Sequence, residues 1–514
     1  MPKVGPPMRF SNYKPAVLEE NNILELSKSD ADTTDFSISS AIPGSHVCST
    51  DTTEVLHWRA ELPFTLPEQS ILGGLVQQYF LSVNWFMHVI DEESFLEIVR
   101  DYTSAETVPR SKRNFMVLVY PSAPYDLRFL ATFRDESCAY IETRMLSLMA
   151  SPDLESVQAG ILFGSFHLFN RLPNLGFGIL GSTIETAQLL GLHRRFSRSA
   201  SERDTYIKVW WALEIFEKYA AIAFGWPCGM DDADCEVPEI QASAIGTNNL
   251  TYHIEKCRLY RIIGTFLGRR KESMTPGQTG DIHERLRAWT HNLPTELRLE
   301  PGATIASVSG LQHMQALALQ LAYDNIHIVI HRQAVFASGP KKPLPLGNAS
   351  SIEQLIESAL RTADTTRSTA MLPICRSSHA AMHAGICLFT AGVVLSALQL
   401  ANIVSDRRDE LLSGLERIIA FFKEFPGQHY HLASQCLEIL QAVQLKCLNH
   451  ASRQGSGALT SRDAELAESI LAAEDFTSIG SLNDHANTAD LLDLASGSSL
   501  QVVAQAWLWS SSLS

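Results

Sequence analysis

The fold is decided by three short runs between Ser156 and Pro238: Ala187-Gln-Leu-Leu-Gly-Leu-His-Arg194, Val209-Trp210-Trp211 and Gly225-Trp226-Pro227. Around the double tryptophan, apolar residues recur at steps of three and four, which is typical of one buried face of an α-helix. This face comprises Trp210, Leu213, Phe216, Ala220 and Phe224. We therefore predict a helix here, with both tryptophans buried.

A second helix is predicted just upstream, carrying Ile184, Ala187 and Leu190 and ending near Gly191, where a glycine can cap it. The preceding segment, 176–181, matches the G-x-G-x-x-G pattern of dinucleotide sites. That pattern needs a strand directly before it, whereas residues 163–169 continue an apolar helix. We predict a flexible connection between helices rather than a cofactor site.

The composition is that of a globular chain with a large core. Of 514 residues, 45% are hydrophobic and 19% are charged, and this length allows two or more domains. The formal net charge is −15, and DNA affinity depends on lysine and arginine that neutralise phosphates. Any direct contact with DNA therefore requires a local basic patch.

The cysteines indicate a reducing compartment. Nine are scattered along the chain without a C-x-x-C pair, which favours free thiols in the cytosol or nucleus over a disulfide framework. The closest pair is Cys228 and Cys235. It makes a poor zinc site, and we expect one of these thiols to be buried and the other exposed.

An acidic run, residues 231–236, suggests an alternative from another class, a helical cyclase that ionises a diphosphate with Mg²⁺ held by carboxylates. Cys235 interrupts the required spacing, and the second motif, Asn483-Asp484, lacks its hydroxyl partner. Proline and glycine bracket the run, which predicts a loop and not a helix. The cyclase remains the enzyme alternative, and the preferred prediction is that the chain is no enzyme.

Helical spacing continues on both sides of this centre. Apolar stripes predict helices that begin near Leu72, Ile254, Ile282, Leu311, Ile386, Leu411 and Leu432. Histidines such as His313, His327 and His331 are expected to be packed or surface residues, because no second pair completes a metal set. The apolar run 386–400 is shorter than a bilayer needs and is predicted to be a core helix.

The ordered set of motifs resembles the regulatory domain, or middle homology region, of fungal zinc-cluster transcription factors. Its parts here are Ser156–Ala159, Ala187–Arg194, Trp210-Trp211 with Glu217-Lys218, Gly225–Pro227 and the acidic stretch that closes on Pro238. Further matches are Tyr79, Phe80, Val83, Asn84 and Phe95, then Leu286, Trp289, Leu293, Pro294 and Leu297, and finally His331-Arg332. Trp226, Ile207-Lys208 and Gln333 depart from the usual residues. The motifs cover 62–336, and the helical pattern alone extends to 448.

The resemblance implies an N-terminal six-cysteine zinc cluster that reads DNA, but only Cys48 precedes residue 62 here. We expect that the protein acts without this reader, through a partner, or that an exon is missing. Residues 101–137 do not follow the family, and 115–120 is a β-prone run. The charge triplet 111–113 is expected to be a solvated turn.

Three regions follow from these patterns: a disordered tail at 1–61, an all-α regulatory domain of many helices at 62–448, and an acidic Ser/Ala-rich disordered tail at 449–514. In the last region, carboxylates alternate with apolar residues, as in activation segments. An acidic solubilising tail remains the alternative.

The resemblance implies a nuclear transcription regulator of RNA polymerase II genes, such as a secondary-metabolite biosynthetic cluster. Its expected partners are promoter DNA, bound directly or through another factor, and the transcription machinery. A homodimer is left open, and no membrane is expected. A co-regulator without zinc is the alternative among binding proteins. We expect a helical scaffold without a pocket for chemistry, and we assign no catalytic, cofactor-binding or metal-binding residue and no cofactor. The DNA-binding residues are unknown.

Overall fold

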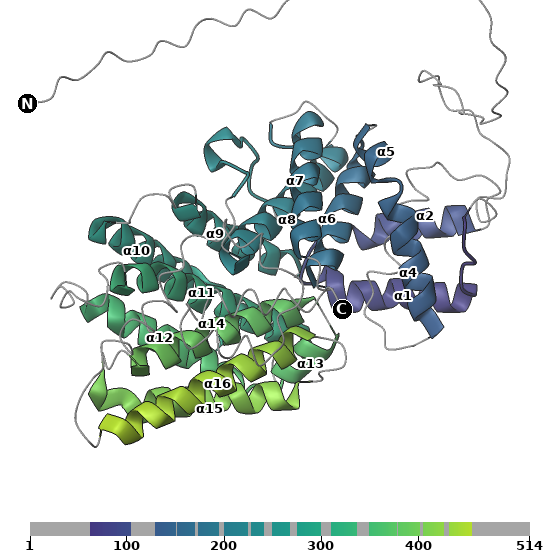
Figure 1. Cartoon of the computed structure of the whole chain (residues 1–514). Coiled ribbons are helices and arrows are strands. Elements are labelled where there is room, and N and C mark those ends of the chain that lie inside the picture. The colour runs from purple at the N-terminus through teal and green to yellow at the C-terminus, as the bar shows by residue number, and fades with distance from the viewer. Residues whose placement is uncertain are drawn as a thin grey trace, which may run out of the picture. The chain divides into compact units, whose positions relative to one another are not determined.

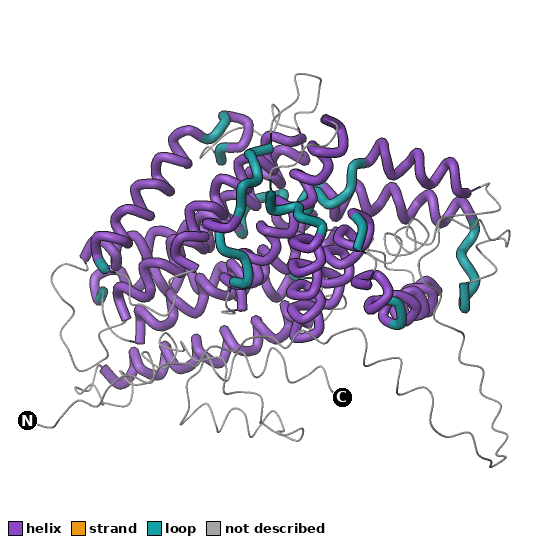
Figure 2. The backbone as a smooth tube through the Cα atoms, turned by 90° about the horizontal axis from the view of Figure 1, so that it is seen from above, coloured by secondary structure: helices purple, strands orange, loops and turns teal. Residues whose placement is uncertain are grey.

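The structure is a computed structural model of the whole chain. It describes residues 62–103, 129–150, 152–169, 173–194, 200–224, 228–240, 249–267, 275–299, 310–336, 349–377, 379–400, 404–425 and 431–454. Every regular element within these ranges is a helix, and no strand occurs among them (Figure 2). The predicted all-α fold is confirmed.

The described helices follow one another along the chain in the order given below (Figure 1). They are α1 (Gln69–Tyr79), η3 (Phe80–Asn84), α2 (Glu92–Thr103), α4 (Phe129–Glu142), α5 (Met145–Ala150), α6 (Leu154–Phe169), α7 (Pro173–Leu189), α8 (Ala200–Phe224), η4 (Asp232–Asp234), α9 (Asn249–Leu267), α10 (Pro276–Asn292), η5 (Thr295–Leu297), α11 (Gly310–Phe336), α12 (Ala349–Thr365), α13 (Met371–Ser377), α14 (Ala380–Leu400), η8 (Ser405–Arg407), α15 (Arg408–Glu424) and α16 (His431–Gln454).

Helix α8 is buried on nearly all sides and not on one face alone. Trp210 and Trp211 are fully buried, as predicted, and so are Leu213 and Ala220 from the predicted face. Val209, Ile215 and Tyr219 on other faces are buried as well. The helix therefore lies inside the protein, with α6, α7 and α9 packed against it.

The predicted flexible connection at 176–181 is wrong, because these glycines lie inside helix α7. Pro173 starts the helix at a position where its missing N–H costs nothing. A Cβ at Gly176 would lie 2.8 Å from the carbonyl oxygen of Gly164 and 2.8 Å from the amide nitrogen of Leu168, both on α6. Glycine is needed at position 176 because α6 and α7 approach closely there. The spacing of glycines in the sequence is the same for a close helix contact and for a flexible connection.

The end of α7 agrees with the prediction. Gly191 has a φ of 72°, its N–H donates to the carbonyl of Gln188, and the N–H of Leu192 donates to that of Ala187. This pair of hydrogen bonds is the Schellman motif, in which glycine adopts the left-handed conformation without a Cβ penalty.

Helices α11, α12, α14, α15 and α16 pack against one another in the C-terminal part of the described chain (Figure 1). Helix α14 is apolar along its whole length. By length and composition alone, Ala380–Gln399 could span a membrane, but 83% of this window is buried in the protein. It lies between neighbouring helices as the predicted core helix.

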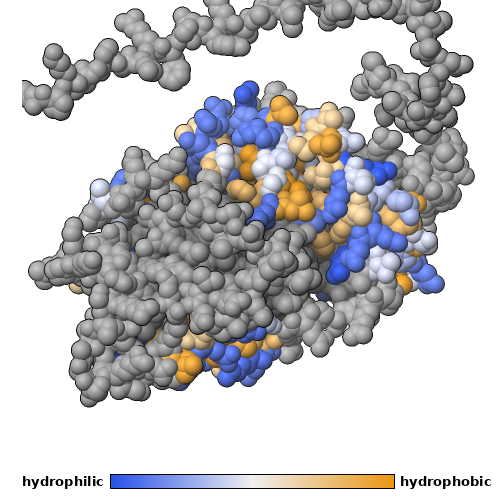
Figure 3. Space-filling view, viewed as in Figure 1, coloured by the Kyte–Doolittle hydropathy of each residue, from blue (hydrophilic) through white to orange (hydrophobic). Residues whose placement is uncertain are grey.

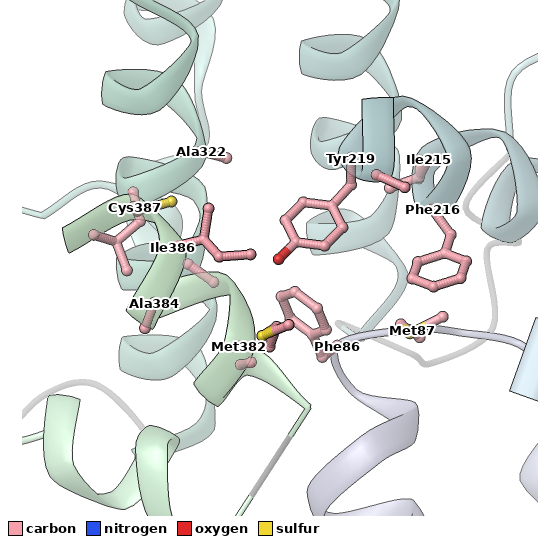
Figure 4. Packing of buried hydrophobic residues seen from close by; sticks show 14 of the residues in the cluster. Phe86, Met87, Ile215, Phe216, Tyr219, Ala322, Met382, Ala384, Ile386 and Cys387 are labelled. Atoms are coloured by element: carbon pink, nitrogen blue, oxygen red, sulfur yellow. The ribbon is translucent and has the colours of Figure 1, made fainter. Parts of the chain in front are cut away.

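One hydrophobic core joins this C-terminal group to α8 (Figure 4). The ring of Phe86, which follows η3, lies between Tyr219 of α8 and Met382 of α14. Cys387 lies on α14 with Met382, and Ala322 of α11 lies beside this helix. Residues far apart in the sequence therefore share one interior.

Few large apolar side chains are exposed among the described residues. The most exposed are scattered over η3, α2, α5, α7 and α16, and Figure 3 shows small hydrophobic areas among hydrophilic ones on the face in view. They are Leu81, Leu96, Leu146, Leu175, Leu189 and Leu445. This scatter points to no particular docking face.

The thiols of Cys228 and Cys235 are both half-buried and free, so the prediction of one buried and one exposed thiol is wrong. The thiol of Cys228 donates to the carboxylate of Glu217 on α8, and that of Cys235 donates to the carbonyl oxygen of Asp231 in the same loop. Both predicted tails, apart from 449–454 in α16, lie outside the described residues, as do Gly225–Pro227 and the predicted β-prone run 115–120.

Candidate ligand pocket beside the double-tryptophan helix

A pocket lies between α8, α9 and the segment that follows η3. It is partly open to solvent, and its empty space, counted together with open solvent at the mouth, is about 480 Å³. Its walls are aromatic and aliphatic, with basic groups among them. The lining residues are Phe86, Met87, His88, Lys208, Trp211, Ala212, Ile215, Phe216, Tyr219, Ile240, His253, Lys256, Cys257 and Tyr260. The sequence did not predict this pocket.

The segment 85–90 forms one wall although it is not helical. Buried Asn84 fixes it, because its side-chain amide donates to the carbonyl of Ile90 at 3.0 Å and accepts from the N–H of Ile90 at 3.3 Å. Gln158 of α6 donates to the carbonyl of Val89 at 2.8 Å. A buried loop must pair its backbone groups, and these amides make this wall a fixed surface.

Lys256 brings a buried amine to the pocket. Its Nζ donates to the carbonyl oxygen of Phe86 at 2.8 Å and lies 3.6 Å from the centre of the Phe86 ring. Burial lowers the pKa of Lys256 to about 7. Among the described carboxylates, none forms an ion pair with this amine. An anion that enters the pocket would supply the missing counter-charge.

Two histidines lie beside each other near Lys256. The rings of His88 and His253 are 5.0 Å apart. Burial, with a contribution from Lys208, lowers the pKa of His88 to about 4 although Asp91 opposes the shift, and burial lowers that of His253 well below its usual value. Both imidazoles are therefore neutral at pH 7.

Some polar atoms of the lining are buried without a protein partner. They are Nε2 of His88, Nε2 of His253 and the hydroxyl of Tyr219. Unpaired buried polar atoms are rare in folded proteins, and each needs an explanation. Here they could form hydrogen bonds with a molecule that enters the pocket.

The acidic run beside α8 has a structural role. Nζ of Lys218 lies 2.5 Å from Oε1 of Glu214 and 2.6 Å from Oδ1 of Asp232. Burial would lower the pKa of Lys218, but these carboxylates outweigh it and raise the pKa. Asp231 accepts from the N–H of Ala233 and caps η4. Two carboxylates that a magnesium site would need are thus engaged within the protein, and Asn483-Asp484 lies outside the described residues.

Glu217 and Trp211 hold the rest of this loop. The carboxylate of Glu217 accepts from the N–H groups of Gly229 and Met230, and the indole of Trp211 donates to the carbonyl of Pro238 at 3.0 Å. The two residues of the Glu217-Lys218 motif therefore bind different parts of the loop. Glu217 binds the backbone of residues 229–230, and Lys218 binds the side chain of Asp232.

The structure also brings together histidines that the sequence left apart. His327 and His331 lie one turn apart on α11, and His283 of α10 meets them. His313 lies elsewhere on α11 and hydrogen-bonds to Ser368 at 2.9 Å. Because His327 and His331 are four residues apart in a predicted helix, the sequence places them on the same face. Nothing in the sequence indicates that His283 lies beside them.

Comparison with known proteins identifies the domain. Residues 76–250 match the family described as the fungal specific transcription factor domain. This range contains most of the pocket lining, including His88, Lys208 and Trp211.

Relatives agree with this match. Two transcriptional regulatory proteins of Schizosaccharomyces pombe, both named uncharacterized, are 22% and 25% identical over 329 and 308 residues, which cover 57% and 52% of this chain and 50% of each relative. The acetamidase regulatory protein of Aspergillus fumigatus is 24% identical over 291 residues, which cover 52% of this chain and 36% of that protein. The match thus spans half or less of each relative. The domain match and these relatives show that residues 76–250 resemble the fungal specific transcription factor domain and that the chain is similar to fungal transcriptional regulatory proteins.

Proposed function

We propose that this protein is a transcription regulator whose helical region binds a small planar anion in the pocket beside α8. The match of residues 76–250 to a fungal transcription factor domain is the observation that supports regulation. The expected targets are RNA polymerase II genes in the nucleus, such as a biosynthetic gene cluster, and the protein acts as a regulator rather than as an enzyme.

Contact with promoters is proposed to be local or indirect. The net charge of −15 opposes attraction of the whole surface to phosphates. We therefore favour DNA contact through a partner factor or a limited basic patch. A co-regulator that joins DNA-binding partners is the second form of this proposal, and the charge balance supports it.

Promoter occupancy tests the regulatory role. The protein is tagged at its own locus, its sites on chromatin are mapped, and transcripts are compared with those of a deletion strain. We expect altered transcripts concentrated at occupied promoters. A protein excluded from the nucleus, or a deletion that leaves transcripts at occupied sites unchanged, would refute it. A DNA pull-down with the purified chain separates direct from indirect contact.

The pocket supports binding of a planar anion because it combines aromatic walls with a buried amine. The ring of Trp211, with the guanidinium carbon of Arg261 3.9 Å from its centre, forms part of the wall. Lys208 and Lys256 are the two lysines among the lining residues. A flat carboxylate would place its ring between the aromatic side chains and its charge at Lys256.

Benzoate and indole-3-acetate are suitable probes, with their neutral amides as matched controls. Tryptophan fluorescence follows the titration, because Trp211 lines the pocket. We expect the carboxylates to bind at least about 10-fold more tightly than the amides, since one charged hydrogen bond contributes roughly 1.5–3 kcal/mol. Lys256→Met should abolish this preference, and Lys423→Met, at an exposed position of α15, should keep it. Equal binding of acids and amides by the wild type would refute the anion site.

A further inference from the structure

Three histidine side chains converge where α10 packs against α11. The ligand-capable nitrogens of His283, His327 and His331 all lie within 4.8 Å of one another. The rings of His283 and His327 have centres 5.2 Å apart, and those of His283 and His331 are 5.5 Å apart. The two α11 rings are stacked, with centres 5.6 Å apart and an interplanar angle of 5°.

Five of the six ring nitrogens in this cluster have no hydrogen-bond partner within the described protein. Both ring nitrogens of His327 and of His331, and Nδ1 of His283, are buried without a hydrogen bond. Native structures rarely leave buried polar atoms unpaired, and a bound ion is one of the standard explanations. Apolar side chains would fill the same space without this cost, so imidazoles here indicate a bound group.

We propose that His283, His327 and His331 form a binding site for a divalent transition-metal ion, with Zn²⁺ as the favoured ion. Imidazole nitrogen is a standard zinc ligand, at about 2.0–2.1 Å from the metal. In a tetrahedral site, two such nitrogens are roughly 3.4 Å apart. Rotations of the histidine side chains, with small shifts of α10, close the distances from within 4.8 Å to this value.

The charges around the cluster are compatible with a cation. Arg361 lies near His327, but its guanidinium is 2.7 Å from the Asp324 carboxylate and 3.7 Å from that of Glu357. Arg287 and the carboxylates of Glu284 and Glu357 act on His283. The cationic groups are thus balanced by carboxylates, and half-buried His283 leaves the fourth position of the ion open to solvent.

A metal ion in this position would link two helices that the sequence separates. Helix α10 packs against α9 and α11, and α11 in turn packs against α12 and α14. Bound Zn²⁺ would therefore stabilise the packing of α10 on α11, and it would do so only in the folded protein.

Metal content and affinity test the site on the full chain, purified without an affinity tag that contains histidine. We expect one Zn²⁺ per chain by elemental analysis, and a Co²⁺-loaded form with the absorption bands of a tetrahedral or five-coordinate site. His283→Ala, at the half-buried edge, should weaken Zn²⁺ binding more than roughly 100-fold, because losing a metal's outer-shell partner alone costs 10–100-fold. His313→Ala on α11 is the matched control and should bind as the wild type does.

Folding is monitored separately, so that a misfolded variant is not mistaken for a lost ligand. Zn²⁺ should raise the melting temperature of the wild type and of His313→Ala but not that of His283→Ala, while all three give the same circular dichroism spectrum. The proposal would be overturned if the wild type bound Zn²⁺ no more tightly than His283→Ala does.

Discussion

The Nζ of Lys256 lies 2.8 Å from the carbonyl oxygen of Phe86, a residue 170 positions earlier in the chain. The same amine lies over the ring of Phe86. Helix α9 and the segment after η3 are thereby joined through one buried amine, and both Lys256 and Phe86 line the candidate pocket.

This burial predicts a pH dependence of stability. Burial lowers the pKa of Lys256 from 10.5 to about 7. Between these values, the unfolded chain binds a proton that the folded chain does not, so the free energy of unfolding rises with pH by up to about 1.4 kcal/mol per unit. Below about pH 7 both states are protonated, so the slope disappears and the destabilisation caused by the buried charged amine is greatest.

Lys256→Met should therefore remove that part of the pH dependence, because its side chain has no proton to lose. Urea unfolding at several pH values from 7 to 10 measures the slope. Lys423→Met on α15 is the control and should follow the wild type. Identical slopes in Lys256→Met and the wild type would show that the amine titrates normally.

Within α7, substitution by alanine should lower the stability of the protein at Gly176 and raise it at Gly178. In Gly176→Ala, the new Cβ meets the α6 backbone at 2.8 Å, and overpacking of this kind costs about 1–3 kcal/mol. Nothing lies within 4 Å of a Cβ at Gly178. Gly178→Ala should therefore stabilise the protein by up to ~1 kcal/mol through helix propensity.

Thermal and denaturant unfolding of the two variants decide whether close approach requires Gly176. If Gly176→Ala proved as stable as Gly178→Ala, the contact between α6 and α7 would be looser than the structure shows.

Burial of Trp211 predicts a large loss of stability on truncation. Its side chain is 1% exposed, donates to the carbonyl of Pro238 and packs against Arg261. Trp211→Ala should reduce the free energy of unfolding by about 3–5 kcal/mol. Leu189→Ala is the control because Leu189 is 76% exposed, and it should change stability by less than about 0.5 kcal/mol. Comparable losses in both variants would contradict the burial of Trp211.

Burial predicts that the Lys218–Glu214 ion pair contributes more to the free energy of unfolding than the exposed Arg258–Glu239 pair does. Lys218→Met leaves the Glu214 carboxylate buried without its cation, which should cost about 3–5 kcal/mol. The pair between Arg258 and Glu239 is about half exposed, so Glu239→Gln should cost no more than about 1 kcal/mol. Urea unfolding measures both variants, and a neutral Lys218→Met would mean that water reaches the network.

The sequence by itself determined the helical class and the buried double tryptophan, because periodic apolar side chains must leave water wherever a helix forms. It also determined the stop at Gly191, since the left-handed conformation at a helix end favours glycine. Motif order similarly led to the transcription factor family, which residues 76–250 match.

Only the tertiary structure decided what depends on contacts between distant segments. Glycine spacing is the same for a flexible connection and for a close helix crossing, and only the neighbouring α6 backbone distinguishes them at Gly176. The amine of Lys256 meets Phe86, and His283 meets His327, across separations that no local pattern encodes. Pocket and histidine cluster alike arise because the packing of whole helices sets which side chains share a buried space.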